Sequence, residues 1–374
     1  MIRGAPTLAT LLLLLSAAAA APVAAQAPTI RWSMANEYPA TSIQGEADAR
    51  FAREVSERSG GRLQIAHQYD AASGFRSKDM VEAIGRGAVP IGNTYMGALG
   101  GLDPVFLLPS LPFLATTAEQ ARALAEVARA AYEQALARHN QRLLFLSPWP
   151  PAGLWAKGPV TSAEALKGLR IRTADANGVL AFRAAGAVPV QISFSDAIPK
   201  LKAGELHAVL SSGDGGAGAR LAEVLKHFTA IEYAVTMSMV TINADAWRAL
   251  DPESQTAVLA AAAATEARQR EVMKTRVAAN YAQMRAAGVG ISTDLSAEYR
   301  RALREAGQVA VDDWLQKTGP AGAQIIERYR KRLVRSSADQ SSALGAKLGV
   351  PTQPLSETST VTPSGPVYFT STLP

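Results

Sequence analysis

Polar and aromatic side chains gather where the predicted strands of the sequence end. These positions are Glu37, Asn93, Tyr95, Arg172, Asp175, Asn177, Phe194 and Ser211. In open α/β sheets, ligands bind beyond the carboxyl ends of the strands. Arg172 ends a buried-looking strand, and its planar guanidinium matches a carboxylate through two hydrogen bonds, which makes it the strongest candidate for binding an anion. An ion pair with Asp175 or Asp196 is the alternative, and spacing alone favours neither.

Signatures of catalysis and of metal or cofactor binding are sparse. The chain has no cysteine, and none of its four histidines has a second histidine at ligand spacing, so we expect no metal site. The glycine-rich segments 97–101 and 213–216 fit neither the dinucleotide fingerprint nor the P-loop, so we expect turns there and no cofactor. A hydrolase would need Ser211 or Ser212 with His207, and these lie too far apart along a strand to bond.

The first 25 residues have the pattern of a secretory signal peptide. One positive charge on Arg3 precedes an apolar run over residues 8–21, and small residues lead to a cleavage site after Ala25. We therefore expect a soluble, periplasmic protein. The formal net charge of +6 is dispersed, without the basic runs typical of nucleic-acid binding, so we expect no nucleic-acid partner and only a weak general attraction for anions.

The elements that must position these residues alternate between strands and helices. Short apolar runs predict strands at 30–34, 63–66, 89–93, 143–146, 169–173, 188–192 and 207–210, with helical patterns between them. Such alternation is typical of βαβ units with a mainly parallel sheet. The segment 147–153 contains three prolines and predicts a crossing between two lobes, and 233–242 predicts the strand that returns.

The remaining sequence completes a two-lobed α/β protein. After Pro252 a helical pattern runs to about residue 287, roughly 50 Å at 1.5 Å per residue, which is long enough to span both lobes. Two further helices are predicted at 297–318 and 321–335. We expect lobe I at 28–150 with 238–265, lobe II at 151–237 with 266–335, and a disordered tail at 336–374, because that tail is rich in Ser, Thr, Pro and Gly.

Several short blocks occur in an order that resembles one known family. The blocks are GLRIRT at 168–173, GAVPVQ at 186–191, FSD at 194–196 and LKAGEL at 201–206, together with 85–89, 111–114 and 228–242. They are similar to the solute-binding subunits of tripartite ATP-independent periplasmic (TRAP) transporters, the DctP family, over most of residues 30–290. The resemblance implies two lobes that close on ligand by a hinge motion. It also implies the small and large membrane subunits of the transporter as partners.

The same resemblance implies roles for single residues. The family's carboxylate-binding arginine falls on Arg172, a ligand-contacting phenylalanine on Phe194, and a position that often carries asparagine on Ser211. An arginine common near the start of the second lobe is Trp155 here, and the usual aspartate before the Ser211 position is His207, which disfavours dicarboxylates and sialic-acid-like ligands. An apolar or aromatic ligand body is suggested by Phe75, Tyr95, Trp149 and Trp155.

We therefore predict a protein that binds a small organic acid and performs no catalysis. Arg172 would bind the carboxylate, while polar groups of both lobes, including Asn93, Asn177 and Ser211, would contact the rest of the ligand. Ligand would then favour the closed form, because only that form brings both lobes onto it. Two alternatives remain open, namely a ligand-presenting sensor module of the same fold and an exported hydrolase.

Overall fold

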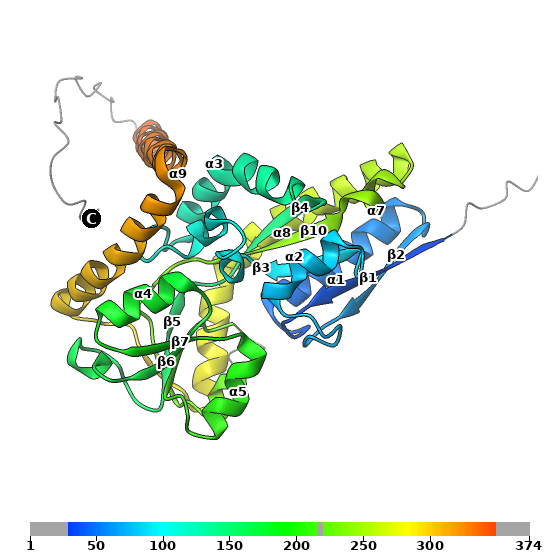
Figure 1. Ribbon diagram of the computed structural model, residues 1–374. Coiled ribbons are helices and arrows are strands. Elements are labelled where there is room, and N and C mark those ends of the chain that lie inside the picture. The colour runs from blue at the N-terminus through cyan, green and yellow to red at the C-terminus, as the bar shows by residue number, and fades with distance from the viewer. Residues whose placement is uncertain (1–28, 215–219, 349–374) are drawn as a thin grey trace, which may run out of the picture.

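The computed structural model describes residues 29–214 and 220–348, with side chains up to residue 335. Two separate β-sheets, each covered by helices, form two lobes (Figure 1). This confirms the predicted two-lobed α/β fold. The predicted signal peptide at 1–25 lies outside the described residues. Across the described ranges, no helix has both the length and the hydropathy needed to cross a bilayer.

The sheet of lobe I has the strand order β2-β1-β3-β10-β4. Its strands are β1 (Ile30–Asn36), β2 (Leu63–Gln68), β3 (Ile91–Tyr95), β4 (Gln141–Pro148) and β10 (Met237–Asn243). The first three run parallel, whereas β10 lies antiparallel to both β3 and β4. The strand predicted at 233–242 therefore does return the chain to lobe I, and every residue of β10 is buried.

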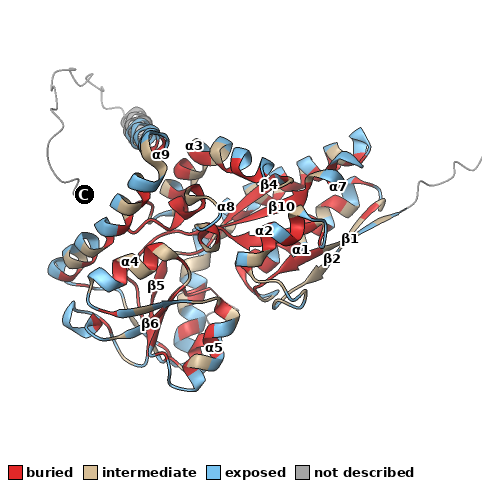
Figure 2. Ribbon diagram, viewed as in Figure 1, coloured by how far each residue is buried: buried red, intermediate tan, exposed pale blue. Residues whose placement is uncertain are grey.

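Helices α1 (Ile43–Arg58), α2 (Ser77–Gly85) and α3 (Ala118–Ala137) belong to this lobe. Helix α1 begins where the Ser42 hydroxyl accepts a hydrogen bond from the Gly45 amide, and it buries its predicted face, which includes Phe51 and Val55. Helix α3 begins with a capping box between Thr117 and Gln120. Figure 2 shows the buried residues concentrated in the strands and on the inner helix faces.

The sheet of lobe II has the strand order β11-β9-β5-β8-β6-β7. Its strands are β5 (Ala152–Ala156), β6 (Arg170–Thr173), β7 (Val188–Gln191), β8 (Ala208–Ser212), β9 (His227–Thr229) and β11 (Gly290–Ser292). Strands β6, β7 and β8 are parallel as predicted, and β5 runs antiparallel to β8 and β9. Helices α4 (Ala176–Ala184) and α5 (Phe194–Lys202) follow β6 and β7.

Up to residue 290 the described chain passes between the lobes at three places. Two are the connections from β4 to β5 and from β9 to β10, and the third is helix α8 (Pro252–Ala286), which follows the short α7 (Ala244–Arg248). Near its start α8 packs Val258 into the core of lobe I, and near its end Met284 packs against Gly213 of lobe II (Figure 1). The prediction of one long helix spanning both lobes is therefore confirmed.

Helix α9 (Ala297–Leu348) breaks at Gly319, whose φ of 57° is left-handed, so two helices follow α8 as predicted. However, only its first part packs into lobe II, through Tyr299, whereas Trp314 and Tyr329 pack with α3 and the 3₁₀ segment η2 (Pro104–Ser110) of lobe I (Figure 1). Its backbone also stays helical past residue 336, where we expected the tail to begin; residues 349–374 lie outside the described residues.

Candidate functional site

A pocket lies between the lobes at the carboxyl ends of β6 and β8. Its inner part has a volume of about 40 Å³ and is walled by the rings of Tyr38, Trp149 and Phe194. An outer part of about 250 Å³ shares Arg172 and Phe194 with the inner part and opens along α5. The walls therefore come from both lobes, as a cleft that closes around a small ligand requires.

Arg172 lines both parts of this pocket although its side chain is buried. Its Nε donates a hydrogen bond of 2.9 Å to the carbonyl of Ile192, and its guanidinium carbon lies 6.0 Å from the ring centroid of Phe194. The segment that follows β7 therefore fixes the guanidinium by one nitrogen. Within the described residues, no ion pair or hydrogen bond engages its two terminal nitrogens. Of the acids expected as alternative partners, Asp196 pairs instead with Arg76 of lobe I at 3.3 Å.

Asp175 joins the two lobes directly through Tyr95. Its Oδ1 accepts the Gly178 amide at 2.9 Å and so caps α4, while its Oδ2 accepts the Tyr95 hydroxyl at 2.7 Å. Burial raises the pKa of Asp175, against the lowering effect of these hydrogen bonds and of the Arg172 charge. The close approach depends on Gly97, where a Cβ would lie 2.7 Å from Asp175 Oδ2. The glycine-rich segment here is a short 3₁₀ turn, η1 (Met96–Leu99).

Glu37 forms a second contact between the lobes. One carboxylate oxygen accepts the Ser77 amide at 2.8 Å and the other accepts the Phe194 amide at 3.1 Å, and these amides begin α2 and α5. A carboxylate is favourable at a helix N-terminus because the first amides of the helix have no backbone partner there. Glu37 lines the outer pocket, but its oxygens already hold these two helix ends together across the cleft.

Four of the predicted ligand residues do not line either part of the pocket in the described ranges. Asn93 donates to Asp48 at 2.7 Å inside lobe I, and Asn177 donates to the Leu107 carbonyl at 2.9 Å. Trp155 is fully buried in the core of lobe II, where its indole nitrogen donates to the Ser212 carbonyl. Phe75 packs beside α2, with Arg86 over its ring. The structure thus gives these side chains partners elsewhere.

Tyr95, Asp175, Phe194 and Ser211 do line the pocket, whereas the sequence did not indicate that residues of the segment before β10 line it too. Tyr233 and Thr236 line the inner part, and they come from the stretch that returns the chain to lobe I. Ala152 contributes from the opposite crossing segment. The sequence indicated both crossings and singled out Trp149, which lines the inner pocket, but it carried no signal for Tyr233 and Thr236 of the return segment.

Comparison with known proteins places this architecture in a family. The model of bacterial extracellular solute-binding proteins, family 7 (DctP), matches residues 34–318. The chain belongs to the DctP family. Accordingly it is a solute-binding protein of the TRAP transporter type, as the residue blocks of the sequence indicated.

Individual relatives of this DctP protein are distant but cover most of it. The 2,3-diketo-L-gulonate-binding periplasmic protein of Escherichia coli is 25% identical over 297 residues, which are 78% of this chain and 88% of that protein. A Bordetella pertussis extracytoplasmic solute receptor that binds pyroglutamic acid is 28% identical in sequence. Its structure has a TM-score of 0.77 and covers 81% of this chain and 100% of that chain. A marine metagenome TRAP protein specific for pyroglutamate is 27% identical with a TM-score of 0.76, over 81% and 99% of the respective chains.

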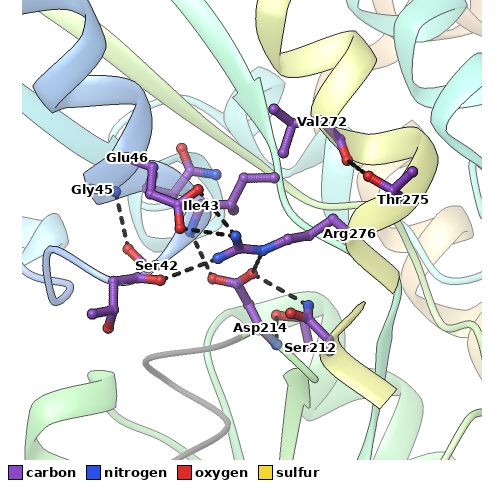
Figure 3. Close-up of polar contacts among 12 residues, drawn as sticks. Ser42, Ile43, Gly45, Glu46, Ser212, Asp214, Val272, Thr275 and Arg276 are labelled. Carbon is purple, nitrogen blue, oxygen red and sulfur yellow. Dashed lines mark hydrogen bonds and ion pairs between the residues drawn. The ribbon is translucent and has the colours of Figure 1, made fainter. Parts of the chain in front are cut away.

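A third contact between the lobes of this DctP protein lies at Asp214, just after β8 (Figure 3). The Asp214 carboxylate is fully buried and accepts the Ile43 amide at 2.7 Å, at the beginning of α1. It also accepts Arg276 Nε of the spanning helix at 2.7 Å, and Arg276 in turn donates to the half-exposed Glu46. Asp214 thus mirrors Glu37, because each lobe supplies a carboxylate to a helix N-terminus of the other.

We expect Asp214→Ala to weaken ligand binding about tenfold by favouring the open form. The variant removes a buried partner of Arg276 and of the α1 amide, and the contact with that amide joins the lobes only when they are closed. Glu46→Gln is the matched control, because it removes an exposed partner of the same arginine and should change affinity less than about twofold. Calorimetry measures affinity, and small-angle scattering measures the opening. Equal affinities in the two variants would contradict this role.

Proposed function

We propose that this protein captures a small monocarboxylate in the periplasm and delivers it to the membrane subunits of a TRAP transporter. The observation that supports this most is the buried guanidinium of Arg172, whose terminal nitrogens have no partner among the described residues. A buried cation without a partner is costly, and a carboxylate would supply two charge-assisted hydrogen bonds. The DctP family consists of solute-binding receptors, and we propose binding without catalysis here as well.

The surroundings of Arg172 favour one negative charge on the ligand. Among the described residues that line the inner pocket, Arg172 is the only cation, and Asp175 is the acid beside it. A second carboxylate in the inner part would meet that acid without a second cation to balance it. Lys78 lines the outer part, but there it stands beside the acids Glu37 and Asp196. Rings of Tyr38, Trp149 and Phe194 offer flat apolar walls for the body of the ligand. The inner part, at about 40 Å³, is too small for a ring acid by itself, so the body of such a ligand would extend into the outer part of about 250 Å³. Two relatives of known structure bind pyroglutamate, so we propose small ring acids as the ligand class.

A change of population between two forms of the protein would connect binding to transport. Tyr95–Asp175, Glu37 and Asp214 each join the lobes, so the described conformation is closed. A ligand that contacts Arg172 of lobe II and the rings of lobe I would add to these contacts only in that closed form. The membrane subunits would then recognise the closed shape.

Thermal unfolding with matched ligands tests this proposal. We expect pyroglutamate at about 100 times its Kd to raise Tm by several degrees, because a ligand that binds only the folded protein stabilises it. The control is 2-pyrrolidinone, which keeps the lactam ring and lacks the carboxylate, and it should leave Tm unchanged. Equal shifts from both compounds, or no shift from pyroglutamate and other small monocarboxylates, would overturn the proposed function.

A further inference from the structure

The later part of α9 holds the densest charge of the chain. Residues 328–335, the basic segment, contain five cations and no acid, so they account for five of the six formal net charges. The expectation of dispersed charge is therefore wrong for this segment. All five cations are exposed; they are Arg328, Arg330, Lys331, Arg332 and Arg335. A local excess of one charge attracts an extended surface of the opposite charge.

The buried side of the helix fixes how the basic segment is presented. Ile326 and Tyr329 pack into the core of lobe I, and the Tyr329 hydroxyl donates a hydrogen bond of 3.0 Å to the Leu114 carbonyl. The exposed side chains therefore point away from lobe I. Figure 1 shows this part of α9 outside α3 and on the other side of the molecule from α5, which borders the outer pocket. The basic segment can thus contact another surface without covering the cleft.

One face of this helix combines cations with an apolar side chain. Arg328, Lys331 and Arg335 follow one another at spacings of three and four residues, which places them on the same helix face. Val334 comes three residues after Lys331 and is 71% exposed, the largest fraction among the exposed large apolar side chains of the described residues. Long cationic side chains around an exposed apolar one are typical of a helix that lies at a membrane surface.

Nearby acids neutralise only part of this charge. Glu327 pairs with Lys331 at 2.6 Å, and Glu126 of α3 pairs with Arg332. Both pairs reach solvent, so each contributes little. Among the residues that the structure describes, no ion pair engages Arg328 or Arg335. The exposed face therefore keeps a positive charge that an anionic partner can neutralise.

The composition of this face favours lipid over nucleic acid as that partner. Tyr329 is the one aromatic residue of the basic segment and is fully buried, so no ring is free to stack on a base. An anionic lipid surface needs no such ring, because cations bind its headgroups through charge and Val334 can enter its apolar boundary. The membrane subunits proposed as partners of this protein would lie in such a surface.

We propose that the basic segment of α9 binds the anionic phospholipid surface of the membrane, with Arg328, Lys331 and Arg335 against the headgroups. Such binding would hold the protein near the membrane subunits whether or not a ligand is bound. Each cation near an anionic surface contributes about a fivefold gain in affinity, and salt weakens the attraction. The inference goes beyond the proposed function, and its test needs no ligand, so its failure would leave the proposed ligand class untouched.

Sedimentation with lipid vesicles tests the inference on the mature protein. We expect binding at low ionic strength to vesicles of phosphatidylglycerol and phosphatidylcholine in equal parts, and no binding to pure phosphatidylcholine. Arg328→Gln, Lys331→Gln and Arg335→Gln, combined in one variant, should lower the partition coefficient about 30–100-fold, because three cations are lost. Glutamine has a helix propensity close to those of arginine and lysine, so Tm should stay within about 2 °C of that of the unmodified protein.

The matched control combines Arg268→Gln, Arg301→Gln and Arg304→Gln, which removes the same charge from exposed positions outside the basic segment. It should lower the partition coefficient less than about threefold, because charges distant from the bound surface are screened. Equal losses in the two variants would mean that net charge alone attracts the protein, and would overturn the inference. Equal binding to both kinds of vesicle, or binding to neither, would overturn it too. A variant of the basic segment that lost binding to duplex DNA but kept its binding to vesicles would assign the face to nucleic acid instead.

Discussion

Replacing Arg172 with alanine is expected to weaken pyroglutamate binding by about 10²–10³-fold. The guanidinium lies in a buried pocket, so its bonds to a carboxylate would form away from water, and truncating one partner of such a pair typically costs about 3–5 kcal/mol. Arg172→Lys keeps the charge but loses the planar pair of donors, and its Nε bond to the Ile192 carbonyl is lost too. We therefore expect an intermediate affinity for the lysine variant, measured by isothermal titration.

Arg170 provides the matched control for this experiment. It lies on the same strand, two residues before Arg172, but its side chain is exposed. Arg170→Ala should leave the affinity within about twofold of the unmodified protein, because the exposed Arg170 side chain lines neither part of the pocket. Unfolding transitions of all variants in the absence of ligand should agree within a few degrees. Unchanged affinity in a folded Arg172→Ala variant would refute the carboxylate role of this residue.

The sequence indicated that Arg172 lines the pocket, together with Tyr95, Asp175, Phe194 and Ser211. The strand that ends at Arg172 can be recognised from a short run of neighbouring residues. Its carboxyl end marks the edge of a parallel sheet, where ligands bind. Asn93 also follows this rule, yet it binds Asp48, which lies on α1 and is distant in sequence. Trp155 lies not in the cleft but in the core, where its ring centroid is 5.3 Å from that of Phe228 and its indole nitrogen donates to the Ser212 carbonyl. Whether a side chain at a strand end faces the cleft or the core depends on its contacts with residues that are distant in sequence. A single sequence does not reveal those contacts.

The sequence likewise predicted the fold only in part. Strands and helices with clear periodicity and caps were recognised, and so was the break before Pro320. Strands β9 and β11 have three residues each, too few to show a periodic pattern, and they exist because they pair with β5 and with each other. The packing of the later part of α9 on α3 also escaped prediction, because an amphipathic pattern identifies a buried face without identifying the element that covers it.

The Asp48 network yields a second large expected effect, on stability rather than affinity. Asp48 is fully buried and accepts Asn36 at 2.6 Å and Asn93 at 2.7 Å. Burial outweighs both hydrogen bonds and raises the pKa of Asp48 from 3.8 to about 7. Between these pH values the folded protein keeps a proton that the unfolded chain has released. The free energy of unfolding should therefore fall by about 3–4 kcal/mol as the pH rises from about 4 to about 8, most of it before pH ~7.

Asp48→Asn separates this contribution from all other titrations. The Asn93 carbonyl oxygen is buried without a partner among the described residues, so rotating that amide would let it accept from the amide nitrogen introduced by the substitution, while Asn36 still donates to the introduced carbonyl. His67 nearby has its pKa lowered by burial and gives a stability change of opposite sign, but it is present in both proteins and cancels in the difference. Urea unfolding over the same pH range should show the unmodified protein losing stability relative to Asp48→Asn as the pH rises. A difference that stays constant over this range would mean that Asp48 is already ionised in the folded protein, with the two asparagines stabilising a buried charge.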